Sequence, residues 1–154
     1  MQKPLTEKRL QNIALYYLER FDASSEKLRQ TLKRRIQRQK MAGIPIHPSA
    51  YTWVEQILEK MKSLGYINDE RYTENIIRRL SESGKSTRFI RQKLLVEGIS
   101  EDTLEKFLSP DDELARAKNF VHKKHLGQGY QKDLAKLARA GFSYEIAQQV
   151  LKGE

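Results

Sequence analysis

The side chains best suited to chemistry in this sequence are basic, and many of them lie in one short stretch. Residues 26–40 hold seven Lys and Arg residues but a single acid, Glu26. At about 100° per residue of helix, these cations surround nearly all of the circumference outside the apolar stripe of Leu28, Leu32 and Ile36. An ordinary solvated face usually mixes both signs, so this density favours an electrostatic footprint for nucleic acid or for an acidic protein. The cations are Lys27, Arg29, Lys33, Arg34, Arg35, Arg38 and Lys40.

A second group of cations spans residues 78–93 and is less concentrated. Acids are interspersed at Glu74, Glu82 and Glu97, so part of this group is expected to be ordinary surface. The group consists of Arg78, Arg79, Lys85, Arg88, Arg91 and Lys93. The run His122-Lys123-Lys124-His125 falls late in a predicted helix, where the negative end of the helix dipole already favours cations.

Six aromatic residues could stack on nucleobases if they are exposed. Most of them lie on apolar helix stripes, so we expect core packing for all except Tyr16 and Trp53. The six are Tyr16, Tyr17, Tyr51, Trp53, Tyr66 and Tyr72.

Motifs for metal, nucleotide or catalytic chemistry are incomplete. His122 and His125 could share a helix face, but the chain has no cysteine and no carboxylate at a useful spacing, so we expect no metal. Gly84-Lys85-Ser86-Thr87 resembles the end of a phosphate-binding loop, yet Arg79 stands where the first glycine is needed and a helix precedes it. No Ser, His and Asp residues form a suggestive catalytic grouping. The sequence therefore predicts neither an enzyme nor a bound cofactor.

Composition indicates a cytoplasmic protein with an uneven charge. The 154 residues carry a net charge of +9, and residues 1–66 hold 13 Lys and Arg against 6 Asp and Glu, whereas residues 67–109 hold 8 of each. No apolar run approaches the roughly 18 residues that a membrane span needs. No secretory leader is recognisable, because the first twenty residues already have the pattern of an amphipathic helix.

Apolar residues recur at helical spacing in nine segments, and no segment has the alternation of a strand. The predicted helices begin near residues 6, 24, 48, 68, 86, 100, 109, 131 and 144. Several starts carry a residue that caps helix N-termini well. These caps are Ser24 or Ser25, Asn68, Ser86, Ser100 and Ser109.

Helix ends recur along the chain, which indicates a small unit used more than once. Met61–Tyr66 ends a helical pattern with glycine followed by a large apolar residue, and so do 94–99 and 137–142. Five positions from Leu94 to Leu108 recur 43 residues later, from Leu137 to Leu151. Nine short helices thus fall into three sets of three, residues 6–66, 67–109 and 110–154. Sets this small are rarely stable alone, so we expect three tandem three-helix repeats stacked into an elongated, curved rod.

The residues at the centre of the chain resemble a known family. The segment Gly65-Tyr66-Ile67-Asn68-Asp69-x-Arg71-Tyr72 is similar to the central motif of the RecX family, the bacterial modulators of the RecA recombinase. Residues 61–108 carry the specific part of the resemblance, and the order of segments matches along nearly the whole chain. One departure is that the family often has Gly-Pro where this chain has Ser86-Thr87. The match continues with Gly84, Arg88, Ile90, Leu94, Gly98 and Ile99.

The resemblance implies tandem three-helix repeats and a role in recombination and DNA repair. It implies a non-enzymatic protein that lies along the groove of the RecA–DNA filament and restrains strand exchange, ATP hydrolysis and co-protease activity. We expect a monomer without cofactor, metal or membrane contact, with single- or double-stranded DNA as a further partner. The expected contacts are Lys33, Arg34, Arg35, Arg38, Arg71, Lys85, Arg88 and Arg91. The alternative, favoured by the +9 charge and the dense basic helix, is a nucleic-acid-binding helical protein that acts without a recombinase.

Overall fold

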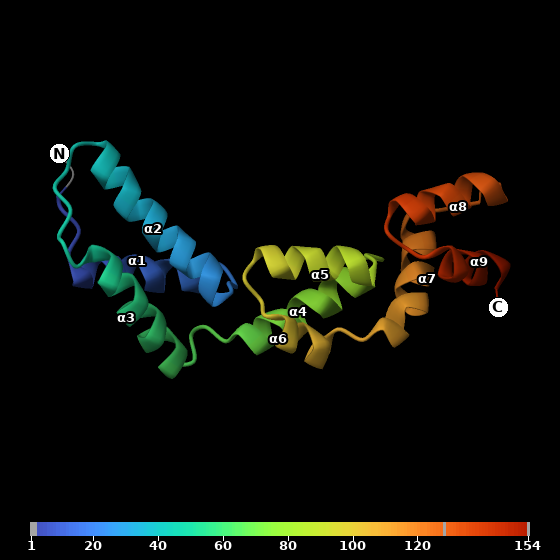
Figure 1. The fold of residues 1–154 in the computed structure, drawn as a ribbon, viewed down its shortest axis with the longest axis horizontal. Helices are drawn as coiled ribbons and strands as arrows, with labels where there is room; N and C mark the ends of the chain where they lie inside the picture. The colour runs from blue at the N-terminus through green and yellow to red at the C-terminus, as the bar shows by residue number, and fades with distance from the viewer. Residues whose placement is uncertain (1–2, 128, 154) are drawn as a thin grey trace. The chain divides into compact units, whose positions relative to one another are not determined.

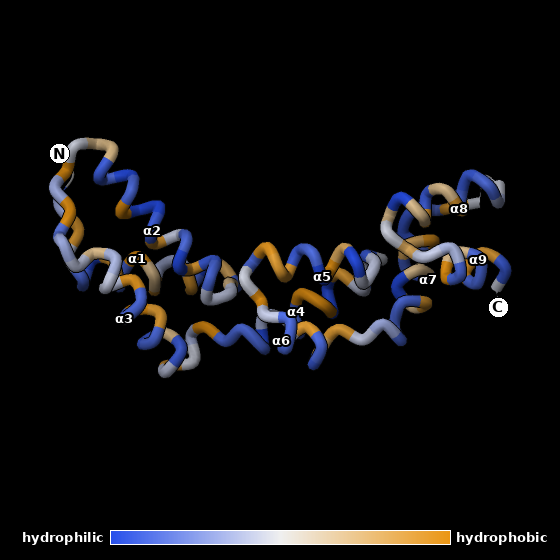
Figure 2. Tube along the Cα trace, in the orientation of Figure 1, coloured by the Kyte–Doolittle hydropathy of each residue, from blue (hydrophilic) through white to orange (hydrophobic). Residues whose placement is uncertain are grey.

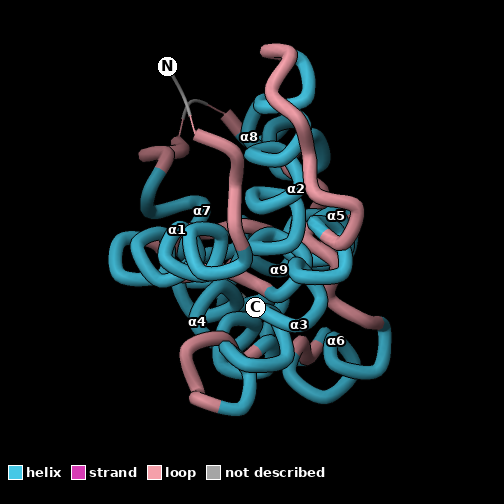
Figure 3. Tube along the Cα trace, turned by 90° about the vertical axis from the view of Figure 1, so that its left-hand side faces the viewer, coloured by secondary structure: helices cyan, strands magenta, loops and turns pink. Residues whose placement is uncertain are grey.

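The structure, a computed structural model, describes residues 3–127 and 129–153. Within these ranges all regular elements are helices, joined by loops (Figures 1 and 3). They are α1 Glu7–Arg20, α2 Ser25–Met41, α3 Ala50–Ser63, α4 Asp69–Glu82, α5 Thr87–Val96, α6 Glu101–Phe107, η1 Pro110–Asp112, α7 Glu113–Lys123, α8 Tyr130–Arg139 and α9 Tyr144–Lys152. The predicted all-α fold class is confirmed. None of the described helices combines the length and the apolarity required to cross a membrane.

Most predicted helix starts are correct because capping is local chemistry. Four of the predicted caps, with Ser24 rather than Ser25 at α2, accept a hydrogen bond from the backbone N–H three residues further on, at 3.0–3.2 Å, which satisfies a donor that the helix itself leaves free. The accepting residues are Ser24, Asn68, Ser86 and Ser100. Helix α7 begins later than expected, because the single 3-10 turn of η1 separates it from Ser109.

The repeated helix ends share one hydrogen-bonding pattern. The N–H that follows the glycine returns to the carbonyl five residues earlier: Tyr66 to Met61 at 2.9 Å, Ile99 to Leu94 at 3.0 Å, and Phe142 to Leu137 at 3.1 Å. This is the Schellman arrangement, in which the intervening residue is left-handed and the flanking apolar residues meet. The sequence repeat is therefore the repetition of one way to end a helix.

The chain divides into two compact units, one ending at Tyr72 and the other beginning at Thr73. In the first unit, α1, α2 and α3 surround a single apolar core. Each fully buried leucine in such a core stabilises by roughly 1.5–3 kcal/mol. The core residues with no exposed surface are Leu10, Ala14, Leu28, Leu32, Ile36, Val54, Leu58 and Met61.

In the second unit, α7, α8 and α9 pack around a core of their own. Ala117, Leu137 and Ala147 are fully buried, and the ring of Phe142 lies 5.6 Å from that of Phe120. The helices α4, α5 and α6 contribute further buried apolar residues, namely Ile76, Ile77, Ile90, Leu94, Leu104 and Leu108.

A buried arginine ties the α4–α5 corner to α7 inside the second unit. Arg116 is 2% exposed, and its guanidinium donates to the Ser81 hydroxyl at 2.9 Å, the Thr87 hydroxyl at 2.7 Å and the Ser109 carbonyl at 3.0 Å. The Glu113 carboxylate accepts the Thr87 N–H at 3.1 Å and so supports the start of α5 from α7. The predicted boundary between residues 109 and 110 thus falls inside one compact unit, and the division into three repeats stays a prediction.

Candidate partner-binding surfaces

Helix α2 holds the expected contacts of the first unit on the face that is not packed. Its stripe of Leu28, Leu32 and Ile36 is fully buried against α1 and α3, whereas most of its remaining length is hydrophilic (Figure 2). Arg34 and Arg38 lie four residues apart, so they are neighbours on one exposed face. The other two expected contacts, Lys33 and Arg35, are half-buried.

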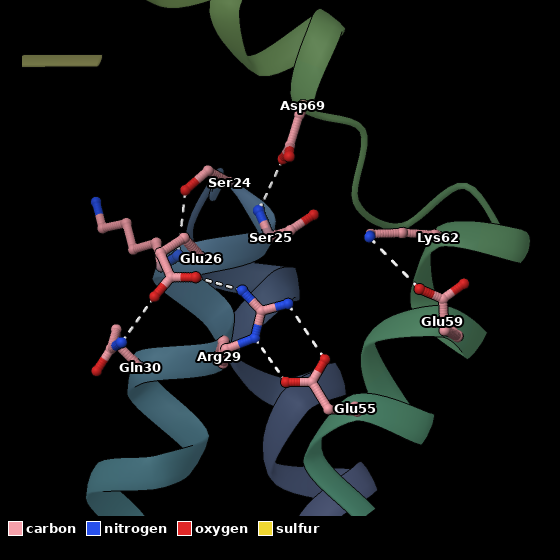
Figure 4. A network of polar contacts seen from close by, with 10 residues as sticks. Ser24, Ser25, Glu26, Arg29, Gln30, Glu55, Glu59, Lys62 and Asp69 are labelled. Carbon is pink, nitrogen blue, oxygen red and sulfur yellow. Dashed lines mark hydrogen bonds and ion pairs between the residues drawn. The ribbon is translucent and has the colours of Figure 1, made fainter. Parts of the chain in front are cut away.

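One cation of α2 is neutralised by carboxylates (Figure 4). The Arg29 guanidinium donates to both oxygens of Glu55 on α3, at 2.7 and 3.2 Å, and it also pairs with Glu26. The hydrogen bond from Arg29 lowers the pKa of Glu55, while Gln30 and then Arg29 lower the pKa of Glu26. Lys33 acts on the same two carboxylates through its charge. Arg29 is therefore a structural link between α2 and α3.

Three expected contacts of α2 keep their charges without a carboxylate partner. In the described ranges, no ion pair joins Arg34, Arg35 or Arg38 to a carboxylate, whereas Arg29 pairs with Glu26 and Glu55. Among the described residues of α2, uncompensated charge is therefore carried by Arg34, Arg35 and Arg38, and also by the exposed Lys27 and Lys40. This is the arrangement that attracts phosphate or carboxylate groups.

Arg71 has a structural role at the corner between α3 and α4. Its guanidinium donates to the Gly65 carbonyl at 3.3 Å, and its backbone N–H donates to the Asn68 side chain at 3.0 Å. A cation at this carbonyl compensates the negative end of α3. Arg71 is exposed, so the same side chain also lies at the surface.

In the second unit, one expected contact, Arg88, borders a groove on α5. The groove has a volume of about 520 Å³ and lies between α5 and the turn that joins α8 to α9. Its wall includes Arg88, the half-buried Lys93 and the side chain of Val96, which is 80% exposed. An adjoining hollow of about 410 Å³ shares Arg88 and includes Arg91. Arg91 also pairs with Glu101, whereas Lys85 lies 4.9 Å from the ring of Phe89.

The groove contains a cation that sequence reasoning missed. Arg139, at the end of α8, lines the wall opposite Arg88. The two are brought together because Gly141 approaches Ser86, whose hydroxyl donates to the Ala140 carbonyl at 3.1 Å. This contact joins positions 54 residues apart, so no local sequence pattern predicts it. A groove with cations at its edges and Phe89, Leu95 and Val96 exposed along α5 can hold an apolar side chain flanked by carboxylates.

The aromatic residues were predicted only in part. Tyr72 is 2% exposed, and Trp53 is half-buried against the ring of His47, 4.7 Å away. Tyr16 is 58% exposed, as expected, but the core packing predicted for Tyr51 and Tyr66 is wrong, because they are 43% and 52% exposed. Tyr51 lies at the margin of the apolar stripe of α3, whereas Tyr66 lies beyond the end of α3, in the turn that follows Gly65.

The fold and these surfaces define a class before any relative is considered. The protein is an all-helical chain that presents cationic surfaces, and in the described ranges no three His, Asp or Glu side chains gather as they would around a metal. These are the features of a binding protein built from small helical units.

Comparison with known proteins identifies the family. The family description "RecX, second three-helix domain" matches residues 68–108. The regulatory protein RecX of Myxococcus xanthus is 35% identical over 92% of this chain and 83% of its own length. This chain belongs to the RecX family of regulatory proteins.

Two further comparisons extend this result. The regulatory protein RecX of Streptococcus uberis is 28% identical over 90% of this chain, which spans about half of that relative (53%). The crystal structure of RecX from Lactobacillus salivarius superimposes with a TM-score of 0.71 at 21% identity, covering 96% of this chain and 95% of that one. The structural match shows a shared fold.

Proposed function

We propose that this protein regulates a RecA recombinase by binding the RecA–DNA filament, and that it mostly inhibits strand exchange, ATP hydrolysis and co-protease activity. It catalyses no reaction itself, and it acts as a monomer in the cytoplasm. The observation that carries the proposal is its 35% identity with a regulatory protein RecX across 92% of the chain. The residues from Gly65 to Tyr72 support it further, because they resemble the central motif of the RecX family, the bacterial modulators of RecA.

The chemistry of the two surfaces supports filament binding. A polymer of protein and DNA offers phosphates and carboxylates at regular intervals, and each unit of this chain carries its own cations for them. In the first unit these are Lys33, Arg34, Arg35 and Arg38 on α2, and Arg71 in the first turn of α4. In the second unit Arg88, Arg91 and Lys85 lie along α5 and its N-terminal corner, beside exposed apolar side chains. Binding at two places on one filament raises avidity without additional contacts at either place.

The test is the DNA-dependent ATPase of a matched RecA in the presence of this protein. We expect inhibition at micromolar protein, and we expect the Arg88→Glu, Arg91→Glu variant to weaken it about tenfold or more, because two attractive charges become repulsive. Loss of the exposed Arg91–Glu101 pair costs at most about 1 kcal/mol, so the variant should remain folded.

The matched control is Arg78→Glu with Arg79→Glu, which makes the same change in net charge on exposed residues of α4. It should inhibit RecA nearly as well as the unmodified protein. If the α5 variant inhibits as strongly as this control, the contact surface is misplaced. If the unmodified protein has no effect on RecA, the proposed function itself is refuted.

A second candidate function, nucleic-acid binding without a recombinase, is favoured by the unpaired cations of α2. Phosphate contacts from Arg34, Arg35 and Arg38 would make binding to bare DNA fall steeply with salt. Binding to DNA at physiological salt, with no effect on RecA, would support this candidate over the first.

A further inference from the structure

An exposed aromatic ring and several cations meet at a hollow on the first unit. The hollow has a volume of about 420 Å³ and lies beside α1 and α2. Tyr16 lines it with 58% of its surface exposed, and Arg35 contributes from α2. The other lining residues are Arg9, Asn12 and Ile13 on α1.

The geometry of the hollow follows from helix spacing. Side chains on a helix lean toward its N-terminus, so Tyr16 leans over the turn that carries Asn12 and Ile13. Arg20, one turn later, leans in the same direction and places its guanidinium 4.4 Å from the centre of the Tyr16 ring. One part of the ring is thus occupied by a cation, while the hollow opens beside it.

The groups around the hollow are held in place before any ligand binds. The guanidinium of Arg9 donates from one nitrogen to the carbonyls of Lys3 and Pro4, at 2.8 and 3.0 Å. The contact with Arg20 restrains Tyr16, and a cation over a ring at an exposed site contributes favourably. A ligand therefore meets a formed site, which lowers the entropic cost of binding.

The geometry points to a site for one base of a single-stranded nucleic acid, stacked on Tyr16 with its phosphates on the arginines. A tyrosine ring offers a face to any base, the Asn12 amide can donate to or accept from a base edge, and Arg35 supplies positive charge for the backbone. Arg38 lies three residues after Arg35 on the same face of α2 and continues the charge beyond the hollow. None of the described residues that line the hollow is a carboxylate, which disfavours a basic peptide.

The preference for a single strand follows from the position of the ring. In a duplex the bases are stacked on one another, so their faces are not available to Tyr16 without an unstacking cost. A single strand can place an unstacked base there at little cost. This inference concerns bare nucleic acid and the first unit, so it does not depend on the proposed action on RecA or on the groove beside α5.

The experiment measures the binding of fluorescent oligonucleotides to the full chain by anisotropy. The probes are a single strand, the matching duplex and an abasic strand of equal length, which keeps the phosphates but lacks bases. We expect the single strand to bind about tenfold more tightly than the abasic strand. Replacement Tyr16→Ala should reduce binding of the single strand to the abasic level, while Tyr16→Phe should keep it.

Three controls separate stacking from charge and from damage to the fold. Tyr51→Ala removes another exposed tyrosine of the same unit and should leave binding unchanged. Arg35→Gln should lower the salt slope of single-strand binding by about 0.7, whereas Tyr16→Ala should leave that slope unchanged. The melting temperature of Tyr16→Ala should fall by only a few degrees, because the ring is exposed and the contact that is lost is the one with Arg20, worth about 0.5–1 kcal/mol.

Specific outcomes would overturn the inference. Equal affinity of the abasic and normal strands, or unchanged affinity of Tyr16→Ala, would show that no base stacks there. Displacement of the strand by an equal concentration of adenosine monophosphate would identify a mononucleotide site instead. Each result leaves inhibition of RecA as a separate measurement, so the two proposals can fail independently.

Discussion

Two arginines of this chain show how environment decides the role of a residue. Arg29 lies at the surface between carboxylates of α2 and α3, so its charge is compensated where water also screens it. Arg116 is buried, and its guanidinium is satisfied by two hydroxyls and a carbonyl. A buried charge is tolerated only when each of its hydrogen-bonding groups has a partner. The two residues should therefore differ greatly in what their removal costs.

Replacement Arg116→Ala should lower the free energy of unfolding by about 3 kcal/mol or more. It leaves a cavity and removes the donor shared by Ser81, Thr87 and the Ser109 carbonyl. Arg116→Lys should also destabilise, because an ammonium cannot reproduce the planar fork. Urea denaturation measures both, and the exposed control Arg79→Ala should stay within about 0.5 kcal/mol of the unmodified protein. A change of that small size for Arg116→Ala would contradict the tie between α4 and α7.

Replacement Arg29→Met should have a small effect that depends on pH. Arg29 lowers the pKa of Glu55 in the folded protein, so the pair stabilises above the ordinary carboxyl pKa of 4.5 and is lost as the pH falls through the lower folded value. Both side chains are partly exposed, which limits the effect at pH 7 to about 1 kcal/mol or less. Urea denaturation of both proteins should show the difference at pH 7 and convergence well below pH 4.5. A difference that persists in acid would indicate lost packing instead.

At the scale of elements, the glycines after α3 and α4 differ in how crowded their surroundings are, so substitutions at the two positions distinguish the cost of backbone strain from the cost of a steric clash. Gly65 and Gly84 are both left-handed, with φ of 78° and 82°. A β-carbon on Gly65 would meet nothing within 4 Å, whereas one on Gly84 would lie 2.5 Å from the backbone of Phe120. Gly65→Ala should thus cost about 1 kcal/mol for its backbone conformation alone.

Gly84→Ala should lower the free energy of unfolding by several kcal/mol. The new β-carbon would suffer the same backbone strain and would also clash with the backbone of Phe120, which cannot move away easily. Thermal melts of the two variants, recorded side by side, test the comparison directly. Equal losses of stability would mean that α7 does not pack against the α4–α5 corner as closely as the structure has it.

The elements also show which features can be read from sequence. Helix starts and ends were predicted because Ser24, Ser86 and the glycines act on backbone groups within a few residues. The groove beside α5 was not predicted, because Arg88 and Arg139 come together only when the second unit folds. Tyr51 was misplaced because a stripe shows which face of a helix is apolar but not which of its members lie at the margin, and Tyr66 was misplaced because it lies in the turn beyond the end of α3. Hydrogen bonds between residues close in the sequence could therefore be predicted, whereas contacts between distant positions could not.

At the scale of the whole molecule, positive charge is shared unequally between the two units. Residues 1–72 hold 14 Lys and Arg against 8 Asp and Glu, and residues 73–154 hold 15 against 12. Net charge alone would attract any polyanion to either unit. The arrangement differs, however, because the cations of α2 surround a helix with few acids, whereas those of α5 border exposed apolar side chains. Different arrangements predict different partners.

Two double variants of equal charge test whether arrangement or net charge decides the partner. Arg34→Glu with Arg38→Glu, and Arg88→Glu with Arg91→Glu, each exchange two positive charges for two negative ones and lower the net charge from +9 to +5. We expect the α2 variant to lose affinity for bare DNA, with the salt slope reduced by about two, because phosphate contacts are removed. The α5 variant should keep most of that slope and lose most of its inhibition of the RecA ATPase. Titrations with DNA alone and with the RecA filament measure both properties, and equal losses in the two variants would show that only the total charge matters.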